Sequence, residues 1–108
     1  MSLSAVMGIS LSGMQAQQTR GTATANNIAN AMKPRYDRLE TSFSSVDAGG
    51  VRASVSPSGA ATFDEGSNVD LAREVVSLIE SEIGFKANAS AFETGADMWD
   101  VLISIKRD

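Results

Sequence analysis

The residue types that could do chemistry in this chain are limited to carboxylates, hydroxyls, amides, arginines and three lysines. The 108 residues include no histidine and no cysteine, so they offer no imidazole base, no thiolate nucleophile and no disulfide. The usual zinc ligand sets draw on those two residue types and are excluded as well. The composition therefore predicts a protein that is not an enzyme and that holds no cofactor and no metal.

One group of acidic and amide side chains has the oxygen ligands that a hard cation such as calcium prefers. Its members are Asp64, Glu65, Asn68, Asp70 and Glu74. They lack the alternating ligand spacing and the glutamate at the twelfth position that an EF-hand requires. Ser67 with Asp70 three residues later instead resembles a capping box, and acidic residues suit the positive end of a helix. We therefore expect a helix to start here.

The charges are distributed unevenly along the chain. The net charge is −4, but residues 1–36 carry only Arg20, Lys33 and Arg35 and sum to +3, so the remainder sums to −7. An acidic chain without a basic stripe is a poor partner for nucleic acid. We expect the basic first segment to pair antiparallel with the acidic last segment, within one subunit or between neighbours. Arg20 is the charged residue that we expect in this pairing.

Two long segments have the periodicity of helices. In residues 3–32, alternating steps of three and four select a mostly apolar set typical of a narrow coiled-coil seam. The same stepping in residues 69–105 selects a nearly continuous apolar set, and a second apolar stripe lies beside it, which is more than one partner helix could cover. The first set is Ser4, Met7, Leu11, Met14, Gln18, Gly21, Ala25, Ile28 and Met32; the second is Leu71, Val75, Leu78, Glu82, Phe85, Ala89, Phe92, Ala96, Trp99 and Ile103.

The middle segment has the pattern of a short β-hairpin. Leu39, Thr41 and Phe43 alternate with polar residues, and so do Val51, Ala53 and Val55 after the turn-forming glycines at 49 and 50. An isolated two-stranded hairpin is marginal in water, so we expect it to lean on a helix or on a neighbouring chain.

The predicted fold is mainly α: a long antiparallel helical hairpin or coiled coil of the N- and C-terminal helices, with a short β-hairpin and loop between them. Residues 1–36 form the first helix and a proline turn, 37–66 the β-hairpin and loop, and 67–108 the second helix, as one structural unit. Helices of about 30 and 36 residues measure roughly 45 and 54 Å, which is too long for a globule. We expect the surplus apolar surface to be buried against other copies.

The two ends of the chain resemble a known family. The run LSGMQAQQTR at 11–20, ANNIANA at 25–31 and the turn residues Pro34 and Tyr36 resemble the N-terminal motif of the bacterial flagellar rod and hook family. The run NVDL at 68–71, Glu74 and FKAN at 85–88 resemble its C-terminal motif. The motifs stand in the right order at opposite ends.

This resemblance implies a structural subunit of the flagellar basal-body rod that assembles through its terminal helices. Its partners would be copies of itself, other rod proteins and the flagellar type III export apparatus, with no nucleic acid and no direct insertion into a membrane. Its place would be the periplasmic rod, reached without a cleaved signal peptide. Residues expected at the assembly interface are Met7, Leu11, Met14, Asn26, Asn27, Ile28, Asn30, Leu71, Val75, Leu78, Phe85, Asn88, Phe92, Trp99 and Ile103.

The chain also departs from the family pattern. The family usually has Thr-Pro-Gly-Tyr where this chain has Lys33-Pro34-Arg35-Tyr36, and an arginine at position 35 would be strained if a positive φ is needed there. The middle segment has no room for the additional β domains of hook and distal rod proteins, so a short proximal-rod subunit is the closest subtype. A divergent relative outside the rod, a secreted helical-hairpin partner protein and a cytoplasmic export adaptor remain alternatives.

Overall fold

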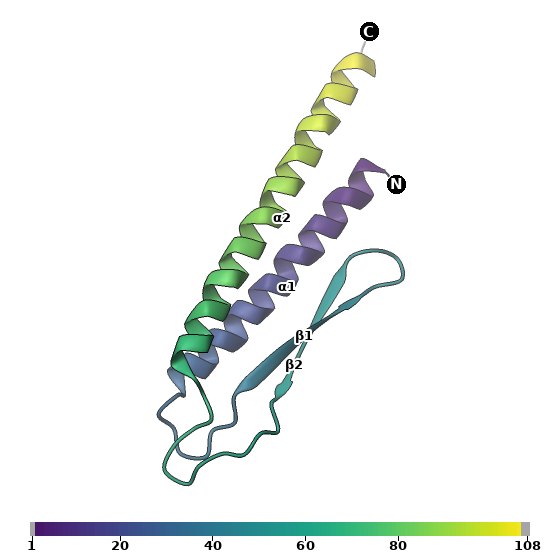
Figure 1. The fold of residues 1–108 in the computed structure, drawn as a ribbon. Coiled ribbons are helices and arrows are strands. Elements are labelled where there is room, and N and C mark those ends of the chain that lie inside the picture. The colour runs from purple at the N-terminus through teal and green to yellow at the C-terminus, as the bar shows by residue number, and fades with distance from the viewer. Residues whose placement is uncertain (1, 107–108) are drawn as a thin grey trace.

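The computed structural model describes residues 2–106 and contains two long helices and one β-hairpin. The elements follow in the order α1 (Leu3–Ala29), β1 (Leu39–Ser45), β2 (Val51–Pro57) and α2 (Leu71–Lys106). The two helices run antiparallel, and the hairpin lies alongside α1 (Figure 1). This arrangement confirms the predicted fold class. Residue 1 and residues 107–108, at the ends of the first and last predicted segments, lie outside the described residues.

Both helices begin at a side-chain cap. The Ser2 hydroxyl accepts a hydrogen bond from the Ala5 N–H at 3.1 Å, and the Asp70 carboxylate accepts from the N–H groups of Ala72 and Arg73 at 3.1 and 3.3 Å. Asp70, rather than Ser67, is therefore the cap of α2, which corrects the predicted capping box. The Ser67 hydroxyl instead donates to the Ala31 carbonyl and so joins the end of α1 to the start of α2.

The β-hairpin has the alternation that the sequence predicts. Leu39, Thr41 and Phe43 face Pro57, Val55 and Ala53 across the antiparallel ladder. The turn contains Gly49 and Gly50, whose φ angles of 102° and 99° favour glycine. The hairpin leans on α1, where the Ser12 hydroxyl accepts a hydrogen bond from the Val51 N–H at 3.1 Å.

The two helices meet along small and polar residues. Gly13 faces Asn88, Gly84 faces Gln17, Gly95 faces Met7, Thr24 faces Ser77 and Asn27 faces Glu74. The glycines let the two backbones approach closely. Of the described residues, only Ala16 and Ala23 are buried hydrophobic side chains, whereas Ser10, Thr24, Asn27, Glu74 and Ser81 are buried polar ones. The core between the elements is therefore thin and polar.

The pairing of the helices corrects one expectation and confirms another. The predicted apolar sets form only part of the contact between the helices. Met7 faces Gly95 and Gly21 faces Ser81, whereas most large apolar members of the second set are exposed. The antiparallel pairing itself is confirmed, and Arg20 bonds the Glu80 carboxylate at 2.6 Å and the Ser77 hydroxyl at 3.1 Å. With 24% and 56% of the Arg20 and Glu80 side chains exposed, solvent screens this pair, which orients the helices more than it stabilises them.

The molecule is elongated and one helix overhangs the other. Its extents are 70 × 25 × 13 Å and its radius of gyration is 18.4 Å, against about 13 Å for a compact domain of this length. In each facing pair of the antiparallel helices, the residue number in α1 and the residue number in α2 add up to 101 or 102. By the same relation, Leu3 at the start of α1 lies opposite Met98. Residues 99–106 therefore extend beyond α1, by about 12 Å at 1.5 Å per residue. The C-terminal end of α2 is seen to pass the N-terminal end of α1 in Figure 1.

Candidate assembly interface

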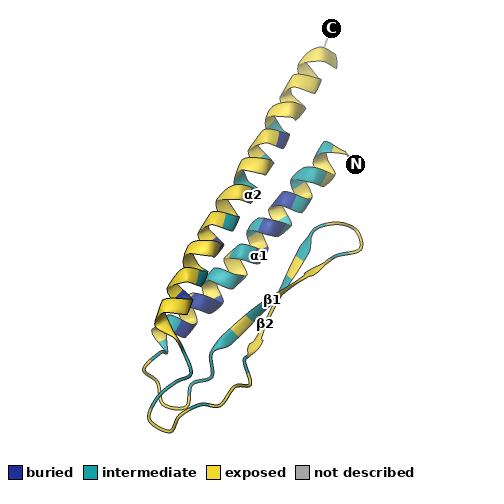
Figure 2. Cartoon of the chain, viewed as in Figure 1, coloured by how far each residue is buried: buried dark blue, intermediate teal, exposed yellow. Residues whose placement is uncertain are grey.

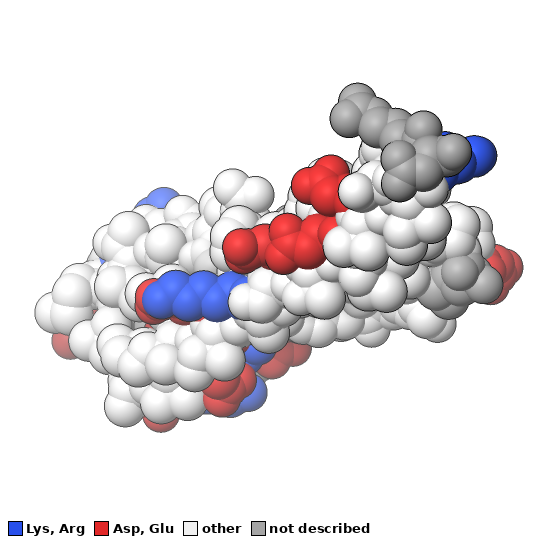
Figure 3. Space-filling model, turned by 90° about the horizontal axis from the view of Figure 1, so that it is seen from above, with Lys and Arg blue, Asp and Glu red and all other residues white. Residues whose placement is uncertain are grey.

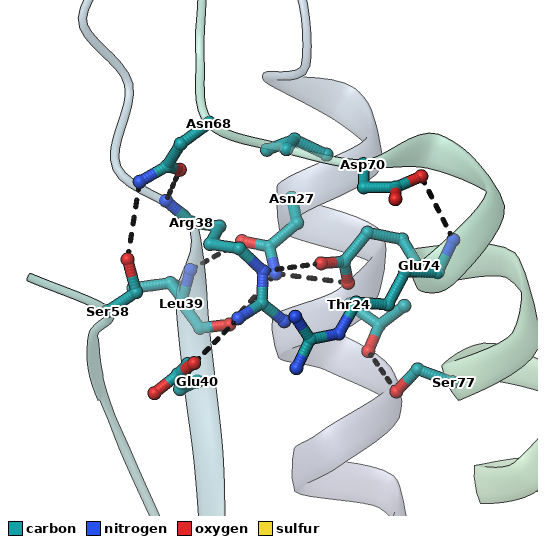
Figure 4. Close-up of polar contacts among 12 residues, drawn as sticks. Thr24, Asn27, Arg38, Leu39, Glu40, Ser58, Asn68, Asp70, Glu74 and Ser77 are labelled. Carbon is teal, nitrogen blue, oxygen red and sulfur yellow. Dashed lines mark hydrogen bonds and ion pairs between the residues drawn. The ribbon is translucent and has the colours of Figure 1, made fainter. Parts of the chain in front are cut away.

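A buried polar cluster joins the end of α1, the start of β1 and the start of α2 (Figure 4). We call it the polar junction; it consists of Asn27, Tyr36, Arg38, Asn68 and Glu74. The Asn27 side chain pairs with the backbone of Leu39, accepting from its N–H at 2.7 Å and donating to its carbonyl at 2.9 Å. These two hydrogen bonds resemble those that a neighbouring strand would make with Leu39, so Asn27 fixes where β1 starts.

The centre of the polar junction is a buried ion pair. Arg38 Nε lies 2.8 Å from one carboxylate oxygen of Glu74, and Asn27 Nδ2 donates to the other at 3.2 Å. Only 14% of the Arg38 side chain and 1% of the Glu74 side chain are exposed. Buried charges cost little only when they are paired and hydrogen-bonded, so each partner depends on the other.

The surrounding loops are tied to the polar junction by further hydrogen bonds. Asn68 Oδ1 accepts from the Arg38 N–H at 2.7 Å, and its amide donates to Asp37 at 2.9 Å. Hydrogen bonds from the Ser58 hydroxyl, the Asn68 amide and the Gly59 N–H hold the pKa of the Asp37 carboxyl below its ordinary value of 3.8.

Tyr36 closes the polar junction from the side of the proline turn. Its hydroxyl donates to Asn27 Oδ1 at 3.0 Å. Burial, followed by the negative charges of Glu74 and Asp37, raises the pKa of Tyr36 above its ordinary value of 10.0. The hydroxyl therefore stays protonated and remains a donor at neutral pH.

The turn before Tyr36 has the strain that the sequence indicated. Arg35 has a φ of 61°, in the left-handed region that few residues other than glycine adopt. Its N–H donates to the carbonyls of Phe63 and Gly66, both at 3.0 Å. Pro34 precedes it, and the Tyr36 N–H donates to the Lys33 carbonyl at 3.2 Å. The loop from Phe63 to Gly66 thus holds the arginine in this conformation.

A broad apolar face of α2 is left open to solvent (Figure 2). Large hydrophobic side chains of this helix are between 39% and 68% exposed along its whole length. They are Leu71, Val75, Val76, Leu78, Ile79, Ile83, Phe85, Met98, Trp99, Val101, Leu102, Ile103 and Ile105. We call this set the open α2 face. Exposed apolar residues in such number are uncommon on monomers and are typical of interaction surfaces.

A groove of about 400 Å³ between the helices borders the open α2 face. Its lining includes Gly21 and Ala25 from α1 and Leu78 and Phe85 from α2. Small residues on one wall and large ones on the other leave space for side chains of another helix.

The residues expected at an assembly interface fall into two groups in the structure. Most lie on the outside: Leu11, Asn26, Leu71, Val75, Leu78, Phe85, Trp99 and Ile103 are exposed, and Met7, Met14, Ile28, Asn30 and Phe92 are half-buried. Asn27 and Asn88 lie between elements of the chain itself. Asn27 is 1% exposed and belongs to the polar junction, and Asn88 packs on Gly13 and donates to the Gly84 carbonyl at 2.8 Å.

Sequence reasoning missed Arg38 and the internal role of Glu74. In the sequence, Glu74 belongs to the C-terminal motif and to the acidic group at 64–74, but neither indicates a buried position. Arg38 stands four residues after Pro34 and belongs to no distinctive pattern. Nothing in their spacing signals that they meet, because 36 residues separate them.

The geometry defines a class of protein: an elongated helical hairpin, fixed at one end by a polar junction, whose apolar faces remain open. Residues 60–105 match the family described as the C-terminal region of the flagellar basal body rod FlgEFG proteins. The C-terminal part of the chain is thus similar to the flagellar rod and hook proteins, in agreement with the resemblance seen in the sequence. The match contains Asn68, Glu74 and all of the open α2 face.

Flagellar hook proteins are similar to part of this chain. The flagellar hook protein FlgE of Rhizobium meliloti (strain 1021) is 44% identical over 43 residues, and that of Brucella suis biovar 1 (strain 1330) is 42% identical over the same length. Each match covers 40% of this chain and 11% of the hook protein, so the chain spans about a tenth of the length of these relatives. Both relatives are named as parts of the flagellar hook.

Proposed function

We propose that this chain is a structural subunit of the bacterial flagellar basal-body rod, which assembles with copies of itself and other axial proteins through its terminal helices. The observation that carries this proposal is that the region matched to the rod and hook family is the helix whose apolar face is open. A face of this kind needs partners, and the relatives are named as parts of the flagellum.

The open α2 face supplies the driving force for assembly. Fully burying a large apolar side chain contributes about 1.5–3 kcal/mol, and many members of this face still expose about half of their surface. Each therefore contributes on the order of 1 kcal/mol when a neighbour covers it. Leu11, Met14 and Ile28 on α1, together with the groove beside Leu78 and Phe85, are the surfaces that we propose to receive it.

The short middle segment favours the rod over the hook. Between α1 and α2 the chain has only the β-hairpin and its loops. A subunit of this design presents its helical hairpin without additional β domains, which fits a short proximal-rod protein. Its proposed location is the periplasmic rod.

The proposed route to the rod is the flagellar type III export apparatus, without a cleaved signal peptide. No helix among the described residues is long and apolar enough to cross a membrane. A thin polar core allows the chain to unfold readily, which suits passage through a narrow export channel.

The proposal is tested by asking whether the chain is present in basal bodies and whether its open face places it there. Deleting the gene should abolish swimming and leave basal bodies without a complete rod. Val75→Glu, on the open α2 face, should reproduce the deletion, because burying an unpaired carboxylate is costly. Ser44→Glu adds the same charge on the exposed side of the hairpin and is the matched control.

In this test the wild-type chain and Ser44→Glu should be recovered with isolated basal bodies, whereas Val75→Glu should be absent from them. Circular dichroism of the purified Val75→Glu chain would verify that the exposed substitution leaves the fold intact. Swimming cells with complete rods after deletion of the gene would overturn the proposal.

A further inference from the structure

The outer edge of β1 has backbone groups without a partner. The Ser58 N–H donates to the Arg38 carbonyl at 2.8 Å, and this pair continues the register of the hairpin. In an antiparallel ladder, pairs that exchange hydrogen bonds alternate with pairs whose N–H and C=O groups point away from the partner strand. Leu39, Thr41 and Phe43 therefore point these groups outward. Those of Thr41 and Phe43 have no hydrogen-bond partner among residues 2–106.

Leu39 shows how this edge accepts a further strand. Its N–H donates to the Asn27 side chain at 2.7 Å and its carbonyl accepts from the same side chain at 2.9 Å, as they would with a neighbouring strand. One amide group serves one residue, so this pairing ends at Leu39. The edge is left incomplete at Thr41 and Phe43, and an unpaired strand edge is a template for another extended chain.

A groove beside this edge has room for a strand. Its volume is about 590 Å³, and its lining comes from β1 on one side and from α1 and α2 on the other. Among the described residues, no Cα atom of α2 lies within 8 Å of a Cα atom in either strand. Neighbouring strands lie only about 4.8 Å apart, so an added strand fits between β1 and α2.

The groove offers one positive side chain that has no partner. Of its charged lining residues, Arg20 bonds the Glu80 carboxylate at 2.6 Å. Arg38 likewise bonds the Glu40 carboxylate at 2.9 Å. Arg73, on the α2 wall, is exposed and forms no ion pair with any residue that the structure describes. In the view from above, by contrast, lysine and arginine side chains are scattered over a mostly uncharged surface (Figure 3).

We infer that an extended acidic segment of another protein adds to β1 as a third strand and lies in this groove. Its backbone bonds the outward groups of Thr41 and Phe43, and one of its acidic side chains faces Arg73. In recognition of this kind, main-chain hydrogen bonds supply the affinity and alternate side chains supply the specificity.

The charges favour such a segment over the hairpin of a second copy. The only charged residue of β2 is Arg52, which has the same sign as Arg73. The only charged residue of β1 is Glu40, and Arg38 already binds it. Neither strand of a second copy therefore brings a free acidic side chain to the groove.

This inference goes beyond the proposed role in the rod and does not depend on it. The rod proposal concerns helical surfaces, whereas this site takes an extended chain at the edge of the hairpin. Absence of the chain from basal bodies would leave the groove as it is. Failure of the binding experiment below would leave the rod proposal standing.

The inference is tested with a synthetic probe. The purified, isotope-labelled chain is titrated with an eight-residue peptide of alternating threonine and glutamate, and NMR signals of the backbone N–H groups report binding. The matched control peptide has lysine in place of every glutamate. We expect the glutamate peptide to bind about tenfold more tightly and to slow hydrogen exchange at Thr41 and Phe43. Equal binding of the two peptides, or no saturable binding up to about 1 mM peptide, would overturn the inference.

Two proline variants locate the site on one edge of the hairpin. Thr41→Pro removes an outward N–H without removing a hydrogen bond of the ladder, a change that edge strands accept. Val55→Pro does the same on the opposite edge, because Val55 lies across the ladder from Thr41. Thr41→Pro should weaken binding of the glutamate peptide about tenfold, and Val55→Pro should leave it unchanged. An equal loss in both variants would contradict binding at the β1 edge.

Two further measurements do not depend on the proline variants. Arg73→Glu changes an exposed side chain and should weaken binding of the glutamate peptide about fivefold, and an unchanged affinity would contradict the role of Arg73. The N–H groups of Thr41 and Phe43 should exchange rapidly in the chain alone at every concentration. Protection that increases with the concentration of the chain would identify a second copy as the occupant and overturn the inference.

Discussion

Glu74 is the side chain on which the closed end of the molecule depends. Its carboxylate accepts hydrogen bonds from both Arg38 and Asn27, and only 1% of the residue is exposed. Glu74→Ala removes the buried partner of Arg38 and leaves it only the exposed Glu40 carboxylate at 2.9 Å. Breaking a buried ion pair typically costs about 3–5 kcal/mol. We expect urea unfolding followed by circular dichroism to show this loss.

The control for this prediction removes both charges together. Arg38→Met combined with Glu74→Leu keeps similar volumes and leaves no buried charge unpaired, since Glu40, which also pairs with Arg38, is 52% exposed to solvent. The double variant should therefore be more stable than Glu74→Ala alone. If Glu74→Ala unfolded at the same urea concentration as the wild type, the polar junction would not be what holds the closed end.

Arg35 stores strain at the proline turn. Its φ of 61° is unfavourable for any residue with a Cβ atom, and glycine adopts it without penalty. Arg35→Gly should therefore raise the free energy of unfolding by about 1 kcal/mol. Arg35→Ala keeps the strain and serves as the control in thermal melting. A melting temperature for Arg35→Gly no higher than that for Arg35→Ala would argue against strain at this position.

Asp37 makes the loop contacts of the closed end sensitive to acid. Its pKa is lower in the folded chain than in the unfolded one, because Ser58, Asn68 and Gly59 donate hydrogen bonds to the carboxylate. The unfolded chain then binds more protons as the pH falls below about 5, so this contribution to stability is complete near neutral pH and is lost as the pH falls through the folded pKa. Asp37→Asn should flatten the stability profile between about pH 5 and pH 2. An unchanged acid profile for Asp37→Asn would contradict this role.

At the scale of elements, two glycines of α1 lie on different surfaces of the helix, one facing open space and one facing α2. A Cβ atom on Gly8 would meet no atom within 4 Å, whereas one on Gly13 would meet the side chain of Asn88. Gly8→Ala should stabilise the lone chain by about 1 kcal/mol through helix propensity alone. Gly13→Leu should destabilise it by about 1–3 kcal/mol because the added side chain forces α1 away from α2. Urea unfolding of both variants checks this contrast, which would fail if they shifted in the same direction.

The register of the β-hairpin could be predicted from the sequence, but the contact surface between the two helices could not. The register of β1 and β2 follows from alternation around Gly49 and Gly50, because only one pairing places Thr41 and Phe43 beside Val55 and Ala53. The helical seam could not be found in the same way. Apolar stepping selects residues of α2 that are mostly exposed in the single chain. The residues packed on α1 include Glu74, Ser81, Gly84 and Asn88, which have no hydrophobic signal.

The polar junction escaped prediction for a different reason. Asn27, Tyr36, Asn68 and Glu74 all belong to the two motifs that resemble the flagellar family, so their importance was visible. Their partners were not, since hydrogen bonds between residues 47 positions apart leave no trace in local spacing. The motif predicts contacts between subunits for Asn26, Asn27 and Asn30, and the structure places Asn27 inside the chain.

At the scale of the whole molecule, the large apolar side chains stay exposed because small and polar residues occupy the contact between α1 and α2. The lone chain buries small and polar residues between α1 and α2 and leaves its large apolar side chains outside, in the reverse of the usual order for a globular domain. We therefore expect the lone chain to be only marginally stable, and the proposed contacts with other subunits to stabilise it by covering the large apolar side chains.

The central claim is that neighbouring subunits cover the open α2 face, and the reactivity of one thiol tests it most directly. Ile83→Cys introduces a cysteine into a chain that has none, at a side chain that is 62% exposed in the single molecule. The account predicts rapid reaction with a maleimide in the purified lone chain and protection from it in isolated basal bodies that contain the variant. Equally rapid labelling of Ile83→Cys in both states would show that the face remains open in the assembly and would contradict the account.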